Sequence, residues 1–317
     1  MMIYPKFHMT PLVTDEQRLE ASRLAPAERQ EMVKNVLFPY DQFKTVSGQI
    51  ERFHRPVKGG KPDTGWMAGL IGEFRSGKTF ILQNFAREFQ PKQTDTGFEQ
   101  EVIYLQARLD WDSLELGRQI YLATGIPTIP RLSTSTLNTK AARRIVECGV
   151  KLIIIDDAHC LLGAAGRRRT VFVSLLKYLL DQVNACNVLL AGPSIVERSM
   201  ESDLQMIGRG GFPRFRVEGF DPKEREGRDK FRLFLHGIDE RLPFRTLSEL
   251  SSKRYIADLI EVSDGSVGFV MNIIIAAGYM AINDGTACIM PEHFHQAAKE
   301  RMATGKNYVP FGQGVVK

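Results

Sequence analysis

The sequence lacks a long apolar run, an internal repeat and a low-complexity tract. Its longest apolar stretch lies near residues 273–282, whereas a helix needs about 20 apolar residues to cross a bilayer. The opening MMIYPKFHMTPLVTDEQ contains no apolar segment of signal-peptide length. We therefore expect a soluble protein of the cytoplasm that has no membrane partner.

Cysteine is scarce, with four residues in a chain of 317 (Cys148, Cys160, Cys186 and Cys288). None of them shares the short paired spacing of a zinc ribbon or a redox dithiol. This pattern indicates free thiols in a reducing compartment and excludes a small disulfide scaffold.

An excess of one charge is nearly absent. The 42 Lys and Arg residues outnumber the 37 Asp and Glu residues only slightly, which leaves a formal net charge of +5. Histone-like basicity is excluded, so the charge permits contact with nucleic acid without arguing for it. Hydrophobic residues at 43% and charged residues at 25% are ordinary globular values and exclude a disordered chain.

Apolar patterning predicts four parts along the chain. Residues 1–55 are a polar lead-in with two expected helices and end at a Gly- and Pro-rich loop. Residues 56–220 form the main domain, residues 221–302 favour helix throughout, and residues 303–317 form a flexible tail. The expected helices outside the main domain lie at 15–24, 26–36, 222–237, 247–262, 267–282 and 291–302.

The main domain alternates short apolar runs with amphipathic stretches. The runs predict strands at 66–71, 102–106, 152–155, 188–191 and 215–217. The stretches between them predict helices at 78–89, 114–124, 136–148 and 171–183. This alternation is typical of an α/β fold with a parallel sheet covered on both faces.

A phosphate-binding loop is predicted at GEFRSGKT, which matches G-x-x-x-x-G-K-[ST] at every fixed position. Glycines let backbone N–H groups point at phosphate oxygens, and the N-terminus of the following helix favours the same anion. In this motif Lys78 reaches the β- and γ-phosphates, and the Thr79 hydroxyl holds Mg²⁺. A glycine-rich turn without a ligand is the alternative. The predicted ATP-binding residues are Gly72, Glu73, Phe74, Arg75, Ser76, Gly77, Lys78 and Thr79.

Two carboxylates, Asp156 and Asp157, follow an apolar strand at 151–155. A buried strand that ends in acid needs a partner for its charge, and Mg²⁺ supplies one. We predict that Asp156 binds Mg²⁺ and that Asp157 orients the attacking water. Asp157 is one methylene shorter than the Glu that many ATPases place there, which predicts slow hydrolysis. A strand that ends in a solvated turn is the alternative.

Together the motifs resemble those of the AAA+ ATPases, and more narrowly those of the TniB/TnsC group of transposition regulators, which is related to phage MuB. The resemblance covers roughly residues 66–301 and rests on GEFRSGKT, LIIIDDAHCLL, RRRTVFVSLLKYLLDQVNACNVLLAGPS, ESDLQMIGR, RLPFRTLSEL and SDGSVGFVMNIIIAAGYMAINDGTACI. It implies a P-loop NTPase fold with a three-layer parallel-sheet core and a small C-terminal helical lid. It also implies a partner-stimulated ATPase that uses ATP and Mg²⁺.

The resemblance also implies roles for single residues. Ser194 falls at the sensor-one place, where a hydroxyl contacts the γ-phosphate or the water; a helix N-cap is the alternative. Arg209 aligns with the arginine finger that reaches the neighbouring subunit's γ-phosphate. Arg214 is the other candidate for this role. The alternative for both residues is an ordinary surface arginine. The lid lacks the sensor-two Arg of many AAA+ proteins, with Gly268, Phe269 and Asn272 near that place.

The function implied by the resemblance is that of a bacterial, ATP-dependent regulator of DNA transposition. Members bind duplex DNA as rings or helical filaments, and head-to-tail contacts that do not close give filaments. The implied partners are a DDE transposase and a TniQ-type target selector, in some systems with a CRISPR effector, and ATP hydrolysis disassembles the oligomer. The alternatives are a loader or signalling ATPase that acts on a protein without DNA, and a scaffold with little catalysis.

The predicted DNA contacts are polar and basic residues that can donate to phosphate. The first group lies before the apolar strand that ends in Asp156 and Asp157, and a second basic cluster lies at 167–169. A solvated helix face is the alternative for both groups. The first group consists of Thr136, Thr139, Lys140, Arg143 and Arg144.

Overall fold

The computed structural model describes residues 4–95, 97–126, 128, 132–163, 167–181, 186–203, 211–301 and 311. Packing divides the chain into two compact units. The sheet unit contains Tyr4 and residues 41–217, and the helical unit contains residues 5–40 and those from 218 onward. The N-terminal segment therefore contributes to both units.

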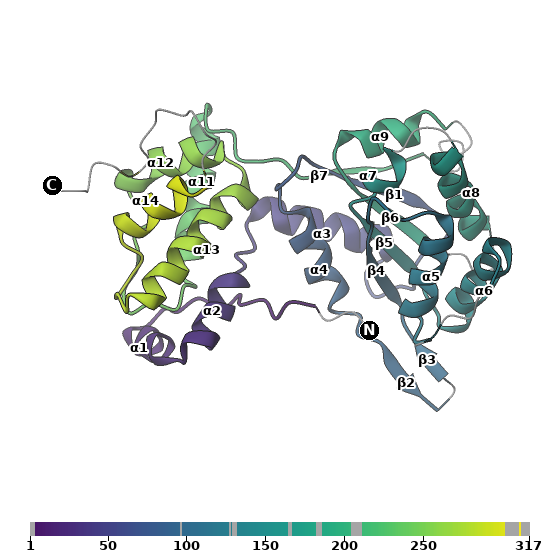
Figure 1. Ribbon diagram of the computed structural model, residues 1–317, viewed down its shortest axis with the longest axis horizontal. Helices are drawn as coiled ribbons and strands as arrows, with labels where there is room; N and C mark the ends of the chain where they lie inside the picture. Colours follow the sequence, from purple (N-terminus) through teal and green to yellow (C-terminus); the bar gives the residue numbers. More distant parts are fainter. Residues whose placement is uncertain are drawn as a thin grey trace. The chain divides into compact units, whose positions relative to one another are not determined.

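The sheet unit is built on a five-stranded parallel sheet, counted over the described residues, with the order β4-β5-β6-β1-β7 (Figure 1). Every residue of β1, β5 and β6 is buried, as expected for apolar strands covered on both faces. This confirms the predicted α/β class. The strands are β1 (Met67–Ile71), β4 (Val102–Gln106), β5 (Leu152–Asp156), β6 (Asn187–Gly192) and β7 (Arg214–Arg216).

The strand order decides which loops meet. β6 pairs in parallel with β1 on one side and with β5 on the other. The strand before the phosphate loop and the strand before the two carboxylates are therefore separated by one strand. Because parallel strands end at the same edge of a sheet, the loops after β1, β5 and β6 lie together there.

Helices cover both faces of the sheet and complete three layers (Figure 1). On one face, α4 contacts β4 and β5, and α3 contacts α4 and β7. On the other face, α5, α8 and α9 contact the sheet, and α6 packs on α5. The helices are α3 (Asp41–His54), α4 (Lys78–Ala86), α5 (Ser113–Ala123), α6 (Thr134–Glu147), α7 (His159–Leu162), α8 (Arg167–Asp181) and α9 (Ser194–Glu201).

Several features of the sheet unit were not predicted: helix α3, the short helices α7 and α9, and a hairpin. Helix α3 buries Phe43, Val46 and Ile50, which lie at helical spacing, so its apolar face was readable in the sequence. A two-stranded antiparallel hairpin pairs β2 (Lys92–Thr94) with β3 (Gly97–Glu99). These strands are short and mostly polar or exposed, so they carry no clear period-two signal.

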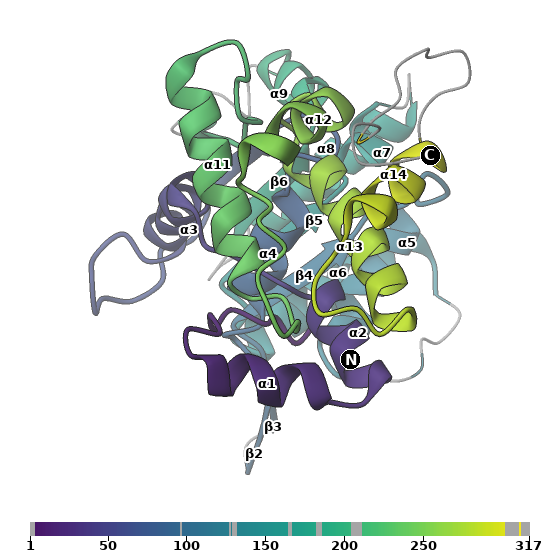
Figure 2. The same ribbon diagram turned by 90° about the vertical axis from the view of Figure 1, so that its left-hand side faces the viewer.

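The helical unit is organised around α13 (Val267–Asn283), which contacts α2, α12 and α14 (Figure 2). Most of α13 is apolar, and its buried positions include Val270, Ile274 and Ala277. The remaining helices of the unit are α1 (Asp15–Arg23), α2 (Pro26–Lys34), α11 (Arg225–Asp239), α12 (Lys253–Ser263) and α14 (Pro291–Lys299).

The lead-in packs differently from the segment expected at residues 1–55. Residues 5–40 belong to the helical unit, whereas α3 belongs to the sheet unit. The Arg29 side chain donates to the Pro243 carbonyl at 3.1 Å and lies over the Phe244 ring at 5.2 Å. The polar helices α1 and α2 have little apolar surface of their own, and α2 covers part of the apolar helix α13.

Helix α12 begins later than the expected residue 247 because the preceding segment is held as a loop. The buried carboxylate of Asp239 accepts the backbone N–H of Ser248 at 2.9 Å and that of Leu250 at 3.1 Å. Glu249 between them has a left-handed backbone, with φ 57°. Of the predicted tail, Phe311 is described, and its ring is buried against Phe294.

Candidate functional site

The phosphate loop joins β1 to α4 and has the backbone that the motif predicts. Gly77 has φ 99°, a left-handed conformation that strains other residues, immediately before α4. Gly72 lies against Val217, the residue that follows β7: a Cβ on Gly72 would come within 2.3 Å of the Val217 carbonyl oxygen and 2.8 Å of Ser76 Oγ. Both glycines are therefore required by the local backbone.

Lys78, the first residue of α4, turns its ammonium group back into the loop. Its Nζ donates to the carbonyl oxygens of Gly72 and Glu73, both at 2.8 Å. Only 8% of the residue is exposed, and this burial lowers the pKa of Lys78, opposed by the nearby carboxylates, with Asp156 first. The ammonium is held by neutral carbonyls, so a phosphate would give it stronger, charged acceptors.

Asp156, at the end of β5, is fully buried, and its carboxylate has three hydrogen-bond donors. Oδ2 accepts from Thr79 Oγ1 at 2.7 Å and from the Tyr104 hydroxyl at 2.8 Å. Oδ1 accepts the backbone N–H of Asp157 at 2.9 Å. Burial raises the pKa of Asp156 above its usual range, and the bonds from Thr79 and Tyr104 oppose this rise.

The predicted metal residues, Thr79 and Asp156, are brought together by the fold. One lies at the start of α4 and the other at the end of β5, and their side chains are hydrogen-bonded. A hydroxyl and a carboxylate are the oxygen donors that Mg²⁺ prefers, commonly together with substrate phosphates. This donor set beside a phosphate loop fits a magnesium ion, which would supply charge neutralisation at the phosphates.

Asp157 lies in a turn after β5, with a left-handed φ of 53°. Its Oδ2 accepts from Gln106 Nε2, at the end of the neighbouring strand β4, at 3.1 Å. Its Oδ1 lies 4.0 Å from His159 Nδ1. Unlike the buried Asp156, this carboxylate is partly exposed and is held at the rim of the site.

Ser194 lies just past the end of β6, the strand that separates the two motifs. It is the first residue of α9, whereas Pro193 occupies the N-cap position, so the N-cap alternative is wrong. The carbonyl oxygen of Gly192, at the end of β6, accepts the Gly72 N–H at 3.1 Å. Ser194 therefore lies two residues after Gly192, whose backbone is hydrogen-bonded to the phosphate loop.

Of the two candidate finger residues, Arg209 lies outside the described residues. Arg214 lies on β7 and pairs with two carboxylates of α9. Its Nε lies 2.7 Å from Glu197 Oε1, and its Nη2 contacts Glu201. Arg214 is thus engaged within its own chain, and it would have to leave these partners to reach a neighbouring subunit.

The predicted DNA residues lie on α6, where four of the five are exposed at helical spacing. These four are Thr136, Thr139, Lys140 and Arg143. The fifth, Arg144, is half-buried and donates to the Thr124 carbonyl oxygen at 2.7 Å, so it ties α6 to the end of α5. In the second basic cluster, Arg169 donates to the Ser199 carbonyl oxygen at 2.6 Å.

Two polar residues of the site were missed by sequence reasoning. Tyr104 and Gln106 both lie on β4 and reach Asp156 and Asp157. β4 pairs with β5 in register, with Gln106 opposite Asp156. Polar residues near the end of an apolar strand were the available signal, but only the strand order shows which neighbour they reach.

The chain matches the sequence model of a family described as bacterial TniB protein over residues 30–221. That span covers most of the chain and contains the phosphate loop and both carboxylates. The chain belongs to the TniB family. No protein of curated function matches this TniB-family chain in sequence.

Solved structures share the fold of this TniB-family protein. The Walker-type ATPase PABY2304 of Pyrococcus abyssi has a TM-score of 0.52 and 16% identity, over 82% of this chain and 71% of that chain. The ORC2 protein of Aeropyrum pernix, solved as ADPNP–ADP complexes, has a TM-score of 0.55 and 14% identity, over 82% and 67%. The Aeropyrum pernix ORC1 protein in complex with DNA has a TM-score of 0.57 and 15% identity, over 82% and 64%. At these identities the likeness shows the fold alone, that of P-loop ATPases.

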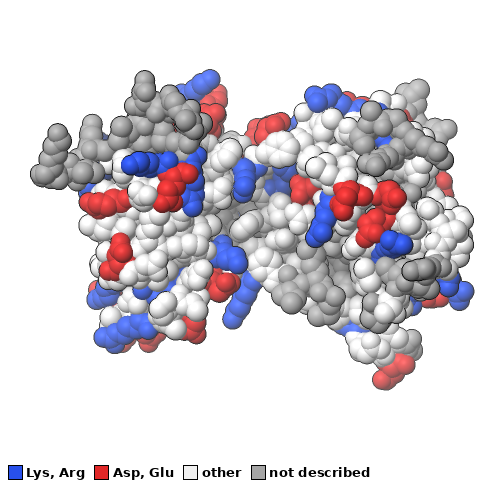
Figure 3. Space-filling view, viewed as in Figure 1, with Lys and Arg blue, Asp and Glu red and all other residues white. Residues whose placement is uncertain are grey.

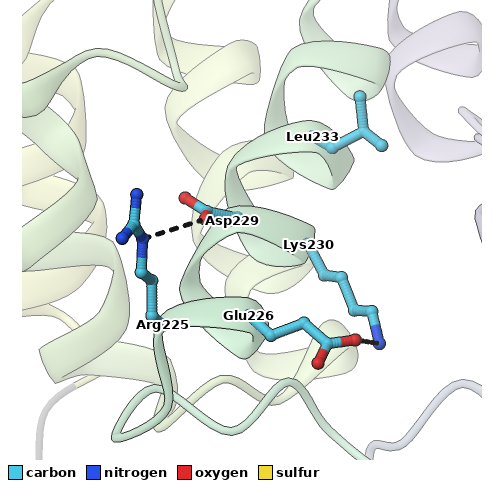
Figure 4. Close-up of a pocket in the computed structure, with 5 residues that line it drawn as sticks. All are labelled: Arg225, Glu226, Asp229, Lys230 and Leu233. Atoms are coloured by element: carbon cyan, nitrogen blue, oxygen red, sulfur yellow. Dashed lines mark ion pairs between the residues drawn. The ribbon is translucent and has the colours of Figure 1, made fainter.

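The remaining surface of the TniB-family chain is of mixed character. Basic and acidic side chains are interspersed over the face drawn in Figure 3, and described residues of one sign form no large area there. A shallow pocket on α11 is lined by Arg225, Glu226, Asp229, Lys230 and Leu233, whose charged groups pair with one another (Figure 4). Among the described helices, none combines the length and apolar character needed to cross a membrane.

Proposed function

We propose that this TniB-family protein is an ATP-dependent, DNA-binding regulator of transposition. The observation that carries the nucleotide part is the hydrogen-bonded pair Thr79–Asp156 beside the phosphate loop. Lys78 and the loop N–H groups bind the phosphates, and Thr79 and Asp156 hold Mg²⁺. Asp157 orients the attacking water with the help of Gln106.

Slow, partner-stimulated hydrolysis is part of this proposal. The short carboxylate of Asp157 lies at the rim of the site, where water competes for it. Arg209 acts in trans as the finger, so that full activity requires a neighbouring subunit. Gly268, Phe269 and Asn272 lie in the first turns of α13, and none of them supplies a sensor-two guanidinium.

The DNA part of the proposal rests on family membership and on the exposed face of α6. Thr136, Thr139, Lys140 and Arg143 present hydroxyl and basic groups along one side of that helix. A protein of the same fold, ORC1 of Aeropyrum pernix, was solved in complex with DNA. A few phosphate contacts per subunit suffice when subunits repeat along a duplex, because binding is then multivalent. This suits the mixed charge seen in Figure 3.

In this proposal ATP binding at subunit interfaces promotes head-to-tail oligomers or filaments on duplex DNA. The assembled protein links a TniQ-type target selector to a DDE transposase, and hydrolysis releases it. Electron microscopy with a non-hydrolysable ATP analogue, with and without duplex DNA, tests this directly. DNA-length filaments that require nucleotide are expected. Nucleotide binding without any assembly on DNA would refute the DNA role and favour a loader that acts on a protein.

A charge-reversal pair tests the α6 face. Lys140→Glu should weaken duplex binding. It should also reduce the slope of log binding constant against log salt concentration by ~0.9, the value for one phosphate contact. Lys61→Glu, at an exposed lysine in the loop before β1, is the matched control and should leave binding unchanged. Equal losses in both variants would indicate a bulk charge effect and refute a contact at α6.

A further inference from the structure

Tyr104 is a buried tyrosine whose hydroxyl group is aimed at the predicted metal carboxylate. It lies on β4, only 3% exposed, and its hydroxyl donates to Asp156 Oδ2 at 2.8 Å. Burial, together with the charge of Asp156, raises the pKa of Tyr104, so the hydroxyl keeps its proton and acts as a donor.

Tyr104 is also held by α4, the helix that begins with Lys78 and Thr79 of the phosphate loop. Its hydroxyl is also hydrogen-bonded to the side chain of Gln83. Thr79 and Gln83 are four residues apart on α4 and therefore lie on the same face of that helix. The chain of contacts runs from α4 through Tyr104 on β4 to Asp156 on β5 and back to α4 through Thr79.

The carboxylate needs such contacts to keep one orientation. The terminal torsion of an aspartate is broad, so packing alone does not define which way its oxygens point. Here Oδ1 is taken by the N–H of Asp157, and Oδ2 by two hydroxyls, those of Thr79 and Tyr104. Without the Tyr104 hydroxyl, Thr79 would be the only side-chain hydrogen-bond donor to Asp156 in the part of the chain that the structure describes.

We propose that Tyr104 is a positioning residue that sets the Asp156 carboxylate for Mg²⁺ and so makes nucleotide binding depend on the metal. It touches neither nucleotide nor metal and acts through Asp156. The inference rests on the proposed nucleotide site and adds to it a residue outside both Walker motifs. A purely structural tyrosine would instead affect stability and all binding equally.

The test measures metal coupling rather than turnover. The Kd of the wild-type chain for a fluorescent non-hydrolysable ATP analogue is measured in Mg²⁺ and in EDTA. The metal coupling is the Kd in EDTA divided by the Kd in Mg²⁺. In Tyr104→Phe this ratio should fall about tenfold, as expected for the loss of one hydrogen bond to a charged group. The Kd in EDTA should stay within about twofold of wild type, because no phosphate contact is removed. Electron paramagnetic resonance of Mn²⁺ should show the same weakening of the metal in the nucleotide complex.

Two further variants keep the outcome clear. Tyr255→Phe removes the same atom from a buried tyrosine on α12 of the helical unit and should leave the coupling unchanged. Gln83→Leu weakens the support of Tyr104 and should give a smaller loss, about two- to threefold, even if Tyr104→Phe folds poorly. Wild-type coupling that persists in Tyr104→Phe overturns the role of Tyr104. Absence of nucleotide binding in the wild type overturns the proposed site itself.

Discussion

Replacement of Lys78 by alanine tests the phosphate loop most sharply. Lys78 Nζ makes two 2.8 Å bonds to neutral carbonyls of its own loop. When a phosphate binds, these bonds to neutral acceptors are exchanged for bonds to an anionic acceptor, each stronger by about 1–1.5 kcal/mol. The exchange is therefore worth about 2–3 kcal/mol, and Lys78→Ala should raise the Kd for ATP by about 30- to 140-fold.

The same variant should leave the fold nearly intact. Alanine loses the loop bonds to Gly72, Glu73 and Ser76, but it also removes the ammonium group of a residue that is only 8% exposed, and such a group is costly to bury. Because these effects oppose one another, we expect the free energy of unfolding to change by less than about 1 kcal/mol. A variant that unfolds would point to a structural role for Lys78.

The assay is a titration with a fluorescent ATP analogue in Mg²⁺, paired with urea denaturation of the same samples. Lys177→Ala on α8 is the matched control, since that lysine is also partly buried and pairs with Asp203 at 2.9 Å. It should bind the analogue as the wild type does. A Kd for Lys78→Ala within threefold of wild type would show that the ammonium does not contact phosphate, and the reasoning would be wrong.

Three further predictions concern other parts of the chain. Asp157→Asn should lower ATP hydrolysis at least tenfold while leaving ATP binding unchanged, and unchanged turnover in a phosphate-release assay would remove Asp157 from the mechanism. Burial lowers the pKa of His54 below its usual 6.5, partly opposed by Glu101, so the unfolded chain binds this proton more readily than the folded one. The stability of the sheet unit should therefore fall as the pH is lowered through 6.5, and urea titrations should show a smaller fall in His54→Gln. Phe244→Ala removes a fully buried ring under Arg29 and should destabilise the helical unit by about 3–5 kcal/mol in thermal or urea unfolding; a loss below 1 kcal/mol would contradict the packing.

Much of the fold was predictable because its strongest signals are local. Apolar Leu- and Ile-rich runs such as the one at residues 152–155 predict buried strands, and their alternation with amphipathic stretches predicts a parallel sheet. The weak signals failed for physical reasons. The hairpin at residues 92–99 is short and polar, and the start of α12 is decided by Asp239, nine residues before Ser248, through a hydrogen bond that no periodicity reveals.

For the candidate site, the sequence by itself determined the residues with fixed spacing. Gly72, Gly77, Lys78 and Thr79 form a loop whose geometry is set by their order along the chain. The two acids after an apolar strand followed from the cost of buried charge. Family membership then rests on the match over residues 30–221.

Only the tertiary structure decided how these pieces act together. The order β4-β5-β6-β1-β7 brings Thr79 within hydrogen-bond distance of Asp156 and places Tyr104 against the same carboxylate. The structure also shows that Arg144 and Arg214 contact groups of their own chain, although the sequence suggested Arg144 as a DNA contact and Arg214 as an arginine finger. Spacing along a strand or helix is a local property, whereas the strand that lies next to another depends on how distant segments pack.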